Sequence, residues 1–234
     1  MEKFSRTISL LGQKNFNKLQ NSHIILCGVG GVGSYVLEAL VRSGIGKITV
    51  IDNDTVSYSN INRQLIATVD TVGMDKTQVA YERAKSINPD VECNPVKKFL
   101  DKDNVPEILP RDADYIVDAI DFVPAKIALA CFAQKYNIPL LSCLGTGNRL
   151  DSTTFEICDV FSTSGCPLAR KMRYELKRAG VTGLEVLYSK ADTVKCNDVF
   201  EDGKKTVGSV AFVPSVAGLM MAQHIILKIA EVEI

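Results

Sequence analysis

The sequence predicts an α/β fold: a Rossmann-like, largely parallel sheet with helices on both faces, extended by antiparallel strands in the C-terminal half. Three observations support this prediction. Apolar runs of strand length alternate with stretches of helical spacing up to about residue 145, the order expected of a parallel sheet with crossover helices. A glycine-rich turn directly follows the first of these runs. The alternation then breaks at a second glycine loop, residues 144–149, after which residues 153–159 are expected to form an antiparallel strand.

Length and composition are consistent with a single domain. The chain has 234 residues and 46% apolar content, so we expect one domain over residues 1–234. Within it we expect a nucleotide-binding half at 1–145 and a C-terminal extension facing the substrate at 146–234. Acidic and basic residues number 27 each, which predicts no overall attraction to nucleic acid or membrane. Any RNA contact therefore needs a local basic patch.

The sequence predicts neither export nor membrane insertion. The N-terminal residues lack the apolar core of a signal peptide. The apolar stretch 210–222 is interrupted by Pro214 and Ser215, and polar residues follow from Gln223 on. This pattern predicts a buried helix rather than a membrane span, and we expect a cytoplasmic protein.

The cysteines predict no structural zinc site, because no two of them form the C-x-x-C pair that usually marks one. Several lie in strand-like apolar runs, where a small, buried, reduced thiol is the ordinary role. The seven are Cys27, Cys93, Cys131, Cys143, Cys158, Cys166 and Cys196. With two histidines in the chain, a His-based catalytic triad or metal cluster is not indicated.

The region around the first glycine turn has the parts of a mononucleotide-binding βαβ unit. In chain order these are a strand at 23–27, the turn Gly28-Val-Gly-Gly-Val-Gly33, a helix at 34–42, and a strand at 47–51 followed by Asp52-Asn53-Asp54. Glycines let the backbone approach a phosphate, whose charge the helix N-terminus stabilises. Asp52 follows Gly33 by 19 residues, about the spacing of an acid that binds a ribose hydroxyl. Dehydrogenases use the same turn, so an ATP site and a dinucleotide site both remain open.

The residues that follow the second strand favour ATP. Asn60, Arg63 and Gln64 come directly after it, and Lys76 follows a short step later. An enzyme that breaks the α–β bond of ATP needs cations at this place, because negative charge accumulates on the phosphoryl oxygens in the transition state. A dehydrogenase has no evident need of them.

Further helices and strands are expected along the chain. The helices are 4–19, 76–86, 103–109, 125–136, 167–178 and 214–232, the strands are 91–96, 115–118, 138–143 and 184–189, and 192–205 is a polar loop. Ligands of an open parallel sheet bind at the carboxyl ends of its strands, and strand 115–118 runs into Asp118 and Asp121. Asp121 is therefore a candidate to hold Mg²⁺ with the ATP phosphates. For Asp118 the ordinary role is a strand-end cap or turn.

The helix expected at 167–178 is the most basic segment of the chain. Leu168, Met172 and Leu176 recur at four-residue steps, which predicts one packed face. Its five positive charges are Arg170, Lys171, Arg173, Lys177 and Arg178. They could bind nucleic-acid phosphates with marked salt dependence or form a solvated helix face, and the residues alone leave both open.

Several motifs of the first half together resemble a known family. They are Gly28-x-Gly-Gly-x-Gly33, Ile51-Asp-x-Asp54, Asn60-x-x-Arg63-Gln64, Lys76 and Val117-Asp-Ala-Ile-Asp121. In order and spacing they are similar to those of the ubiquitin-activating-like adenylating enzymes of the ThiF type, over about residues 4–145.

The resemblance implies ATP and Mg²⁺ at this site. The predicted ATP-binding residues are Gly28, Gly30, Gly31, Asp52, Asp54, Asn60, Arg63, Gln64 and Lys76. The predicted catalytic residues are Arg6, Arg63, Lys76 and Asp121, with Asp121 as the metal-associated acid. On the residues alone Arg6 would be a solvated surface charge. It matches, however, an arginine that dimers of this family insert into the partner's active site, which implies a homodimer.

The second half looks like that of the tRNA threonylcarbamoyladenosine dehydratases. The matching residues are Gly145-x-Gly147-x-x-Leu-Asp151, Ile157-x-Asp159, Pro167-Leu-Ala-Arg-Lys-x-Arg173-x-x-Leu176 and Tyr188-Ser189. This resemblance implies ATP-dependent cyclisation of threonylcarbamoyladenosine at position 37 of tRNA through an acyl-adenylate, with the basic helix holding the tRNA. The chain departs from that family at Cys166-Pro167, at Asp151-Ser152, and at Gly208-Ser209, where some relatives have a cysteine.

Two other functions stay open. One is an adenylyltransferase that activates the C-terminal Gly-Gly of a small sulfur-carrier protein, although such enzymes usually have two C-x-x-C pairs. The other is a non-catalytic nucleotide-binding scaffold in sulfur transfer. A cysteine desulfurase or a sulfur-acceptor protein also stays open as a partner.

Overall fold

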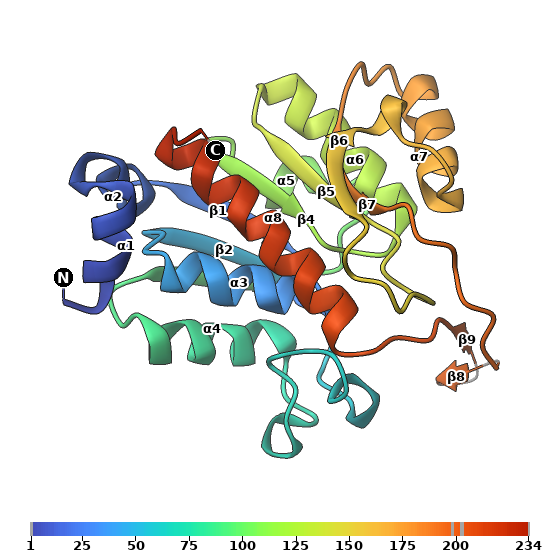
Figure 1. Ribbon diagram of the computed structural model, residues 1–234, viewed down its shortest axis with the longest axis horizontal. Helices are drawn as coiled ribbons and strands as arrows, with labels where there is room; N and C mark the ends of the chain where they lie inside the picture. The colour runs from blue at the N-terminus through green and yellow to red at the C-terminus, as the bar shows by residue number, and fades with distance from the viewer. Residues whose placement is uncertain (1, 198, 202–203, 234) are drawn as a thin grey trace.

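The computed structural model describes residues 2–197, 199–201 and 204–233. Its centre is a seven-stranded sheet in the order β3-β2-β1-β4-β5-β7-β6. Neighbouring strands are parallel except β6, which pairs antiparallel with β7 (Figure 1). The bounds are β1 His23–Cys27, β2 Lys47–Asp52, β3 Glu92–Lys97, β4 Tyr115–Asp118, β5 Leu140–Leu144, β6 Phe155–Asp159 and β7 Glu185–Ser189. The predicted fold class is confirmed.

Helices cover both faces of the sheet (Figure 1). On one face lie α3 (Gly33–Arg42), α4 (Lys76–Ile87) and α8 (Phe212–Ala230), with α1 (Ser5–Leu11) and α2 (Gln13–Gln20) beside them. On the other lie α5 (Val105–Ile108), α6 (Val123–Tyr136) and α7 (Pro167–Arg178). Short 3-10 turns are η1 Glu2–Phe4, η2 Tyr58–Asn60, η3 Val69–Thr71 and η4 Val160–Ser162.

The strands supply both cores because successive side chains point to opposite faces of a sheet. In β1, Ile24 and Leu26 pack in the core under α3 and α8. Ile25 and Cys27 pack in the core under α6 and α7. A strand buried on both faces reads as a continuous apolar run, which is why β1 could be located from the sequence.

Two elements differ from the expectation. The N-terminal helix expected at 4–19 is interrupted at Gly12, whose φ of +79° ends α1 before α2 begins. The loop expected at 192–205 contains a small hairpin of β8 (Val199–Glu201) and β9 (Lys204–Thr206), while residues 198, 202 and 203 of that loop lie outside the described part of the chain. Strands of three residues are too short to show an alternating pattern.

Helix α8 passes a length and composition test for a membrane span, but it packs as a core helix, as the sequence predicted. Val213, Ala217, Met221 and Ile225 are completely buried, and Gly218 approaches the backbone of α3 so closely that a Cβ there would lie 2.5 Å from Val32 O. The apolar residues of α8 therefore pack against α3 and the sheet.

The strand order places a topological switch point between β1 and β4. From β1 the chain proceeds to β2 and β3 on one side and to β4 and β5 on the other, and ligands of such sheets bind at the carboxyl ends of the strands at this switch point. The connection from β7 to α8 passes along the same edge (Figure 1). It is held there by Asn148, whose O accepts from Val194 N and whose N donates to Gly208 O, both at 2.8 Å.

At the opposite edge, a polar cluster ties α8 to β7. The carboxylate of Glu185 accepts hydrogen bonds from Lys228 Nζ at 2.6 Å and from Tyr115 Oη at 3.4 Å, and it lies 3.4 Å from His224 Nε2. The hydrogen bond with His224 and the ammonium of Lys228 lower the pKa of Glu185 to about 2.

We expect this cluster to make stability depend on acidic pH. Because the pKa of Glu185 is lower in the folded chain than its ordinary value of 4.5, its contribution is complete above about pH 4.5 and is lost as the pH falls toward 2. The side chain is 36% exposed, so solvent screening limits the contribution to about 1 kcal/mol. Urea unfolding from pH 6 to about pH 2.5 measures it, and Glu185→Gln should flatten that part of the profile. An equal slope in the variant would contradict the assignment.

Candidate active site

The glycine turn between β1 and α3 depends on glycine at two positions. Gly28 has a φ of +88°, and a Cβ on it would lie 2.8 Å from Ala119 O. A Cβ on Gly33 would overlap the carbonyl oxygen of Gly28. The turn therefore packs tightly against the residue that follows β4. It continues directly into the N-terminus of α3, whose free backbone N–H groups are suited to bind a phosphate.

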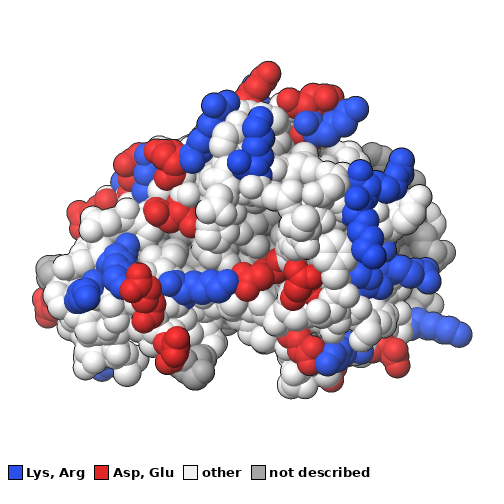
Figure 2. Space-filling model, turned by 90° about the horizontal axis from the view of Figure 1, so that it is seen from above, with Lys and Arg blue, Asp and Glu red and all other residues white. Residues whose placement is uncertain are grey.

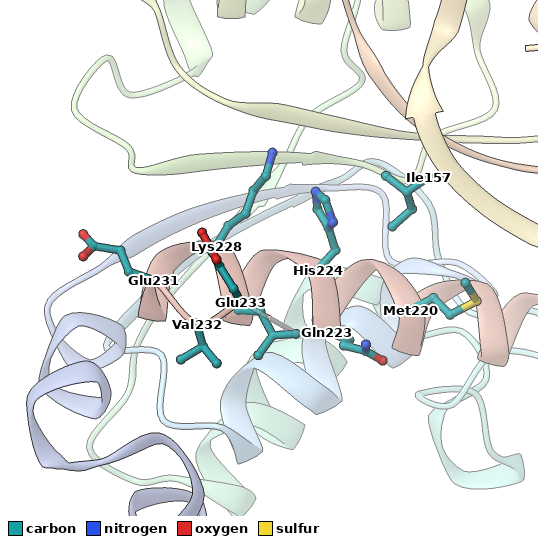
Figure 3. Close-up of a pocket in the computed structure, with 9 residues that line it drawn as sticks. Ile157, Met220, Gln223, His224, Lys228, Glu231, Val232 and Glu233 are labelled. Carbon is teal, nitrogen blue, oxygen red and sulfur yellow. The ribbon is translucent and has the colours of Figure 1, made fainter. Parts of the chain in front are cut away.

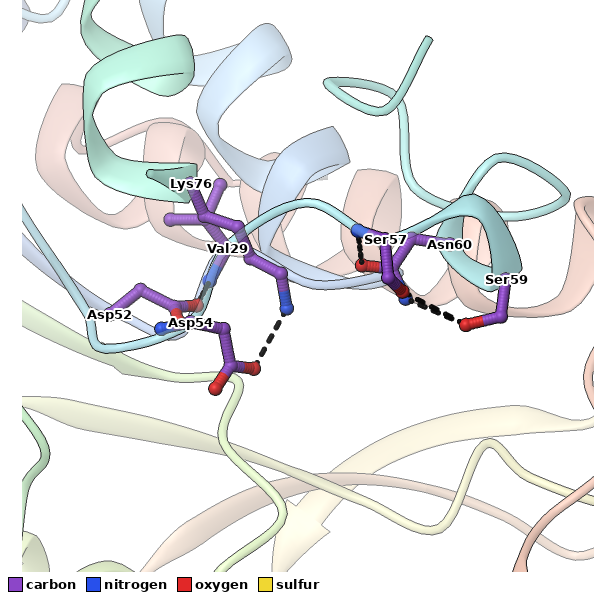
Figure 4. A network of polar contacts seen from close by, with 7 residues as sticks. All are labelled: Val29, Asp52, Asp54, Ser57, Ser59, Asn60 and Lys76. Atoms are coloured by element: carbon purple, nitrogen blue, oxygen red, sulfur yellow. Dashed lines mark hydrogen bonds and ion pairs between the residues drawn. The ribbon is translucent and has the colours of Figure 1, made fainter. Parts of the chain in front are cut away.

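The acid at the end of β2 supports this turn. Asp52 Oδ2 accepts a hydrogen bond from Val29 N at 2.7 Å, and Asp52 Oδ1 accepts one from Asp54 N at 2.9 Å (Figure 4). Asp52 thus fixes the turn after β1 to the loop after β2. Its proposed bond to a ribose hydroxyl remains a prediction.

Lys76 and Asp54 lie at the same place. Lys76 is the first residue of α4, and its side chain is 7% exposed. Its Nζ lies 2.9 Å from Asp54 Oδ2, and Figure 4 shows the two side chains pointing toward one another. The structure therefore brings together two of the predicted ATP-site residues, in an ion pair that the sequence did not reveal.

The segment that contains Asn60, Arg63 and Gln64 packs beside the glycine turn. Asn60 is buried, and its Oδ1 accepts a hydrogen bond from Ser57 N at 3.2 Å (Figure 4). Arg63 Nη1 donates to Ser59 O at 2.7 Å, and Arg63 Cγ lies 3.6 Å from the position of a Cβ on Gly31. The stem of Arg63 thus packs next to the turn, while its guanidinium is held by the backbone oxygen of Ser59 and, at 2.9 Å, by Asn62 Oδ1.

Gln64 has an unpaired side-chain oxygen in this site. The residue is 6% exposed, and its Oε1 has no hydrogen-bond partner among the described residues. Its Nε2 lies 3.8 Å from the position of a Cβ on Gly30. Buried polar atoms are nearly always paired, so the unpaired oxygen of a side chain that packs next to Gly30 fits a site that receives a polar ligand such as a nucleotide.

Beneath the ends of β4 and β5, Asp118 and Lys126 form a buried ion pair. Their side chains are 0% and 1% exposed, and Lys126 Nζ lies 3.1 and 3.0 Å from the two carboxylate oxygens. Lys126 also donates to Ser142 Oγ at 3.3 Å and to Cys143 O at 2.8 Å. Asp118 Oδ1 accepts from Ile120 N at 3.2 Å, so its expected turn role is present, but the ion pair was missed. The one available signal was a lysine within the otherwise apolar stretch 123–133 of α6.

Asp121 is exposed and follows β4 at the edge that carries the glycine turn. Among the residues that the structure describes, no three His, Cys, Asp or Glu side chains are grouped closely enough to hold a metal ion. Mg²⁺ bound with ATP needs only one or two protein carboxylates, since phosphates and water supply the remaining ligands. A role for Asp121 at Mg²⁺ is therefore compatible with the geometry and stays a prediction.

Arg6 lies far from the other predicted site residues. It is exposed on α1, close to Lys3, whose Nζ donates to Asn88 Oδ1 and pairs with Asp90 ahead of β3. That is the amino edge of the parallel strands, opposite the glycine turn, and Figure 1 shows the N-terminal helices at the end of the sheet away from the β7–α8 connection. Arg6 does not reach the site of its own chain.

The basic helix has the packed face predicted for it. Met172 and Leu176 are completely buried, and Leu168 is half-buried. Arg170, Lys171, Lys177 and Arg178 are exposed, whereas Arg173 is half-buried and donates to Thr163 O at 2.9 Å. Figure 2 shows Lys and Arg gathered in a stripe on the side of the molecule where α7 lies in Figure 1. Contact with tRNA stays a prediction.

A separate hollow of about 480 Å³ lies along the C-terminal half of α8 (Figure 3). Its lining residues are Ile157, Met220, Gln223, His224, Leu227, Lys228, Glu231, Val232 and Glu233. None of the predicted ATP-site residues is among them, so this hollow is not the nucleotide site.

Replacement of Lys126 by Met should destabilise the protein strongly. The variant leaves the Asp118 carboxylate buried without its partner, and breaking a buried pair in this way costs about 3–5 kcal/mol. The free energy of unfolding in urea measures the effect. Lys135→Met, an exposed lysine on the same helix, is the matched control and should change little. A loss no greater than that of the control would show that the pair does not hold this edge together.

Comparison with known proteins agrees with this geometry. The model of the ThiF family matches residues 4–233, so the chain belongs to the ThiF family. It is 36% identical over 244 residues to the tRNA threonylcarbamoyladenosine dehydratase of Bacillus subtilis, covering 98% of this chain and 95% of that protein.

Solved structures agree as well. The structure of the Escherichia coli tRNA N6-threonylcarbamoyladenosine dehydratase in complex with AMP has a TM-score of 0.90 and 34% identity, covering 98% of this chain and 94% of that one. The same protein in complex with ATP gives a TM-score of 0.89.

The sulfur carrier protein ThiS adenylyltransferase of Bacillus subtilis is 34% identical over 140 residues, which is 58% of this chain and 41% of that protein.

Proposed function

We propose that this protein is an ATP-dependent adenylating enzyme that cyclises the threonylcarbamoyl group on adenosine 37 of tRNA. The observation that carries the proposal is the meeting of the glycine turn, Asp52, Arg63 and Lys76 at the switch point of the sheet. Similarity to tRNA threonylcarbamoyladenosine dehydratases over 95% of the Bacillus subtilis protein extends it to the second half of the chain. A tRNA substrate implies a cytoplasmic enzyme.

The reaction begins at the threonyl carboxylate. One of its oxygens attacks the α-phosphate of ATP, and the bond to the β-phosphate breaks, which gives an acyl-adenylate and pyrophosphate. The carbamoyl group then attacks the acyl carbon and closes the ring, AMP leaves with the carboxylate oxygen, and one carbamoyl N–H proton is released. The work of the protein is to align the carboxylate with the α-phosphate and to stabilise the charge that develops.

Each site residue has a part in this proposal. Asp52 holds the ribose, and the glycine turn receives the phosphates. Arg63 and Lys76 neutralise the phosphoryl oxygens, and Lys76 passes from Asp54 to the triphosphate when ATP binds. Mg²⁺, held at Asp121 with the ATP phosphates, would supply further positive charge.

The two halves of the chain divide the work in this proposal. Residues 1–145 bind ATP, and residues 146–234 face the tRNA. Because the chain has equal numbers of acids and bases, contact with RNA needs a local basic patch. The exposed cations of α7, the most basic helix, form this patch and hold the phosphates of the anticodon arm. Such contacts position a nucleic acid without reading its sequence.

The sulfur-carrier alternative keeps the adenylation step but changes the acceptor. It is less favoured because similarity to the ThiS adenylyltransferase covers 58% of this chain, against 98% for the dehydratase. A scaffold without turnover would release no pyrophosphate, whichever candidate acceptor is supplied. A cysteine desulfurase or sulfur-acceptor partner would belong to either alternative.

ATP–pyrophosphate exchange tests the proposed function. We expect exchange with tRNA that carries threonylcarbamoyladenosine and none with the unmodified tRNA. Arg63→Ala should lower it by about 100-fold or more, because it removes a charge that stabilises the transition state. Exchange that requires a small Gly-Gly carrier protein and ignores tRNA would overturn the proposal in favour of the sulfur-carrier alternative.

The role of α7 is tested in the same assay. A variant with Arg170 and Lys171 both replaced by Gln should raise the KM for tRNA and reduce the salt dependence of binding, while the KM for ATP stays the same. The control, Lys14→Gln, replaces an exposed lysine of α2 on the other side of the sheet. An effect of this control on the KM for tRNA as large as that of the α7 variant would argue against α7 as the tRNA surface.

We further propose that the enzyme works as a homodimer in which Arg6 enters the active site of the partner. Support comes from its position, since Arg6 is exposed at the amino edge of the strands, whereas the glycine turn lies at the carboxyl edge. An exchange of identical residues between two subunits is natural in a two-fold dimer.

Complementation between two inactive variants tests this arrangement. Arg6→Ala and Lys76→Ala should each be nearly inactive alone. When they are co-expressed and allowed to form mixed dimers, half of the dimers should have one complete site of two, so about a quarter of the wild-type activity should return. No recovery in mixed dimers, verified by two affinity tags, would contradict the exchange of Arg6.

A further inference from the structure

Arg149 is a buried arginine at the carboxyl edge of the sheet. It lies in the loop that follows β5, the residue is 4% exposed, and its Nε donates to Gly145 O at 2.9 Å. Its Nη1 is completely buried and has no hydrogen-bond partner among the residues that the structure describes. This is a buried donor on a permanently charged group.

An arginine in this condition is unfavourable unless an anion joins it. The guanidinium keeps its charge at all physiological pH values, and a buried charge without a counter-ion is strongly destabilising. The other buried cations of the site are paired, Lys76 with Asp54 and Lys126 with Asp118. Arg149 differs from these two lysines because its acceptor is a backbone oxygen and its Nη1 donor is unpaired.

The loop of Arg149 lies between the nucleotide half and the basic helix. It follows β5, which lies next to β4 in the sheet. Asp121 follows the carboxyl end of β4. Cys166, immediately before α7, lies 3.4 Å from the position of a Cβ on Gly145. The β7–α8 connection covers the loop through the hydrogen bonds of Asn148. A ligand group at Arg149 would thus lie between the carboxyl ends of the central strands and the start of α7.

We propose that Arg149 binds the threonyl carboxylate of the substrate and aligns it for attack on the α-phosphate. This inference rests on the proposed function. Arg63 and Lys76 come from the loop after β2 and from α4, so the triphosphate charge is met on that side of the switch point. The remaining anion of the reaction is the carboxylate, which approaches from the other side. A backbone phosphate of tRNA would stay at the protein surface, whereas a carboxylate on an inserted base can reach a buried guanidinium. The planar donors of the guanidinium match the geometry of a carboxylate.

The test compares two tRNAs that differ only in the charge of this group. One carries threonylcarbamoyladenosine, and in the other the threonyl carboxylate is converted to a carboxamide. Their affinities are measured with a non-hydrolysable ATP analogue present. The wild-type protein should bind the carboxylate form about 10- to 100-fold more tightly, the range for a charge-assisted hydrogen bond. Arg149→Met should bind both forms with nearly equal affinity, with ATP affinity unchanged.

Two further variants make the result specific. Arg149→Lys keeps the charge but not the planar donors, so part of the preference should remain, and this variant is decisive if Arg149→Met does not fold. Arg170→Met, on the exposed side of α7, should weaken both tRNAs by the same factor. An undiminished preference in either Arg149 variant would overturn the proposal for Arg149. A wild-type protein that shows no preference and no exchange with modified tRNA would instead contradict the proposed function itself.

Discussion

The carboxylate of Asp118 and the ammonium of Lys126 form an ion pair that joins three elements under the active site. Asp118 ends β4, Lys126 belongs to α6, and the further bonds of Lys126 reach Ser142 and Cys143 on β5. Asp118 also holds the backbone after β4, where Ala119 O packs against Gly28. The glycine turn, Asp121 and the loop after β5 therefore share one rigid support, which suits a reaction whose main requirement is alignment.

Charge is arranged on two sides of this support. On one side, Lys76 is buried with Asp54 as its partner, and Arg63 rests on a backbone oxygen. On the other side, Arg149 is buried with an unpaired donor. The arrangement fits two anions that must be brought together against their mutual repulsion, a triphosphate and a carboxylate. Cations fixed before the reaction stabilise the developing charge without reorganisation in the transition state.

Features encoded locally could be predicted from the sequence. The strands of the nucleotide-binding half are buried on both faces and give apolar runs, and the spacing of Asp52 from the glycine turn depends on one helix and one strand. Features that depend on distant contacts could not be predicted. Lys126 meets Ser142 across two elements, and the loop of Arg149 is joined to the β7–α8 connection through Asn148. The position of Arg6 opposite its own site likewise appears only in the fold.

Isotope transfer tests the central claim most directly, namely that the threonyl carboxylate attacks the α-phosphate of ATP. The substrate is tRNA whose threonyl carboxylate carries ¹⁸O, and the products of one turnover are examined by mass spectrometry. The account predicts one ¹⁸O atom in the phosphate of AMP and none in pyrophosphate. AMP without the label, or label in pyrophosphate or inorganic phosphate, would contradict it, because the oxygen that leaves with AMP must come from the attacking carboxylate.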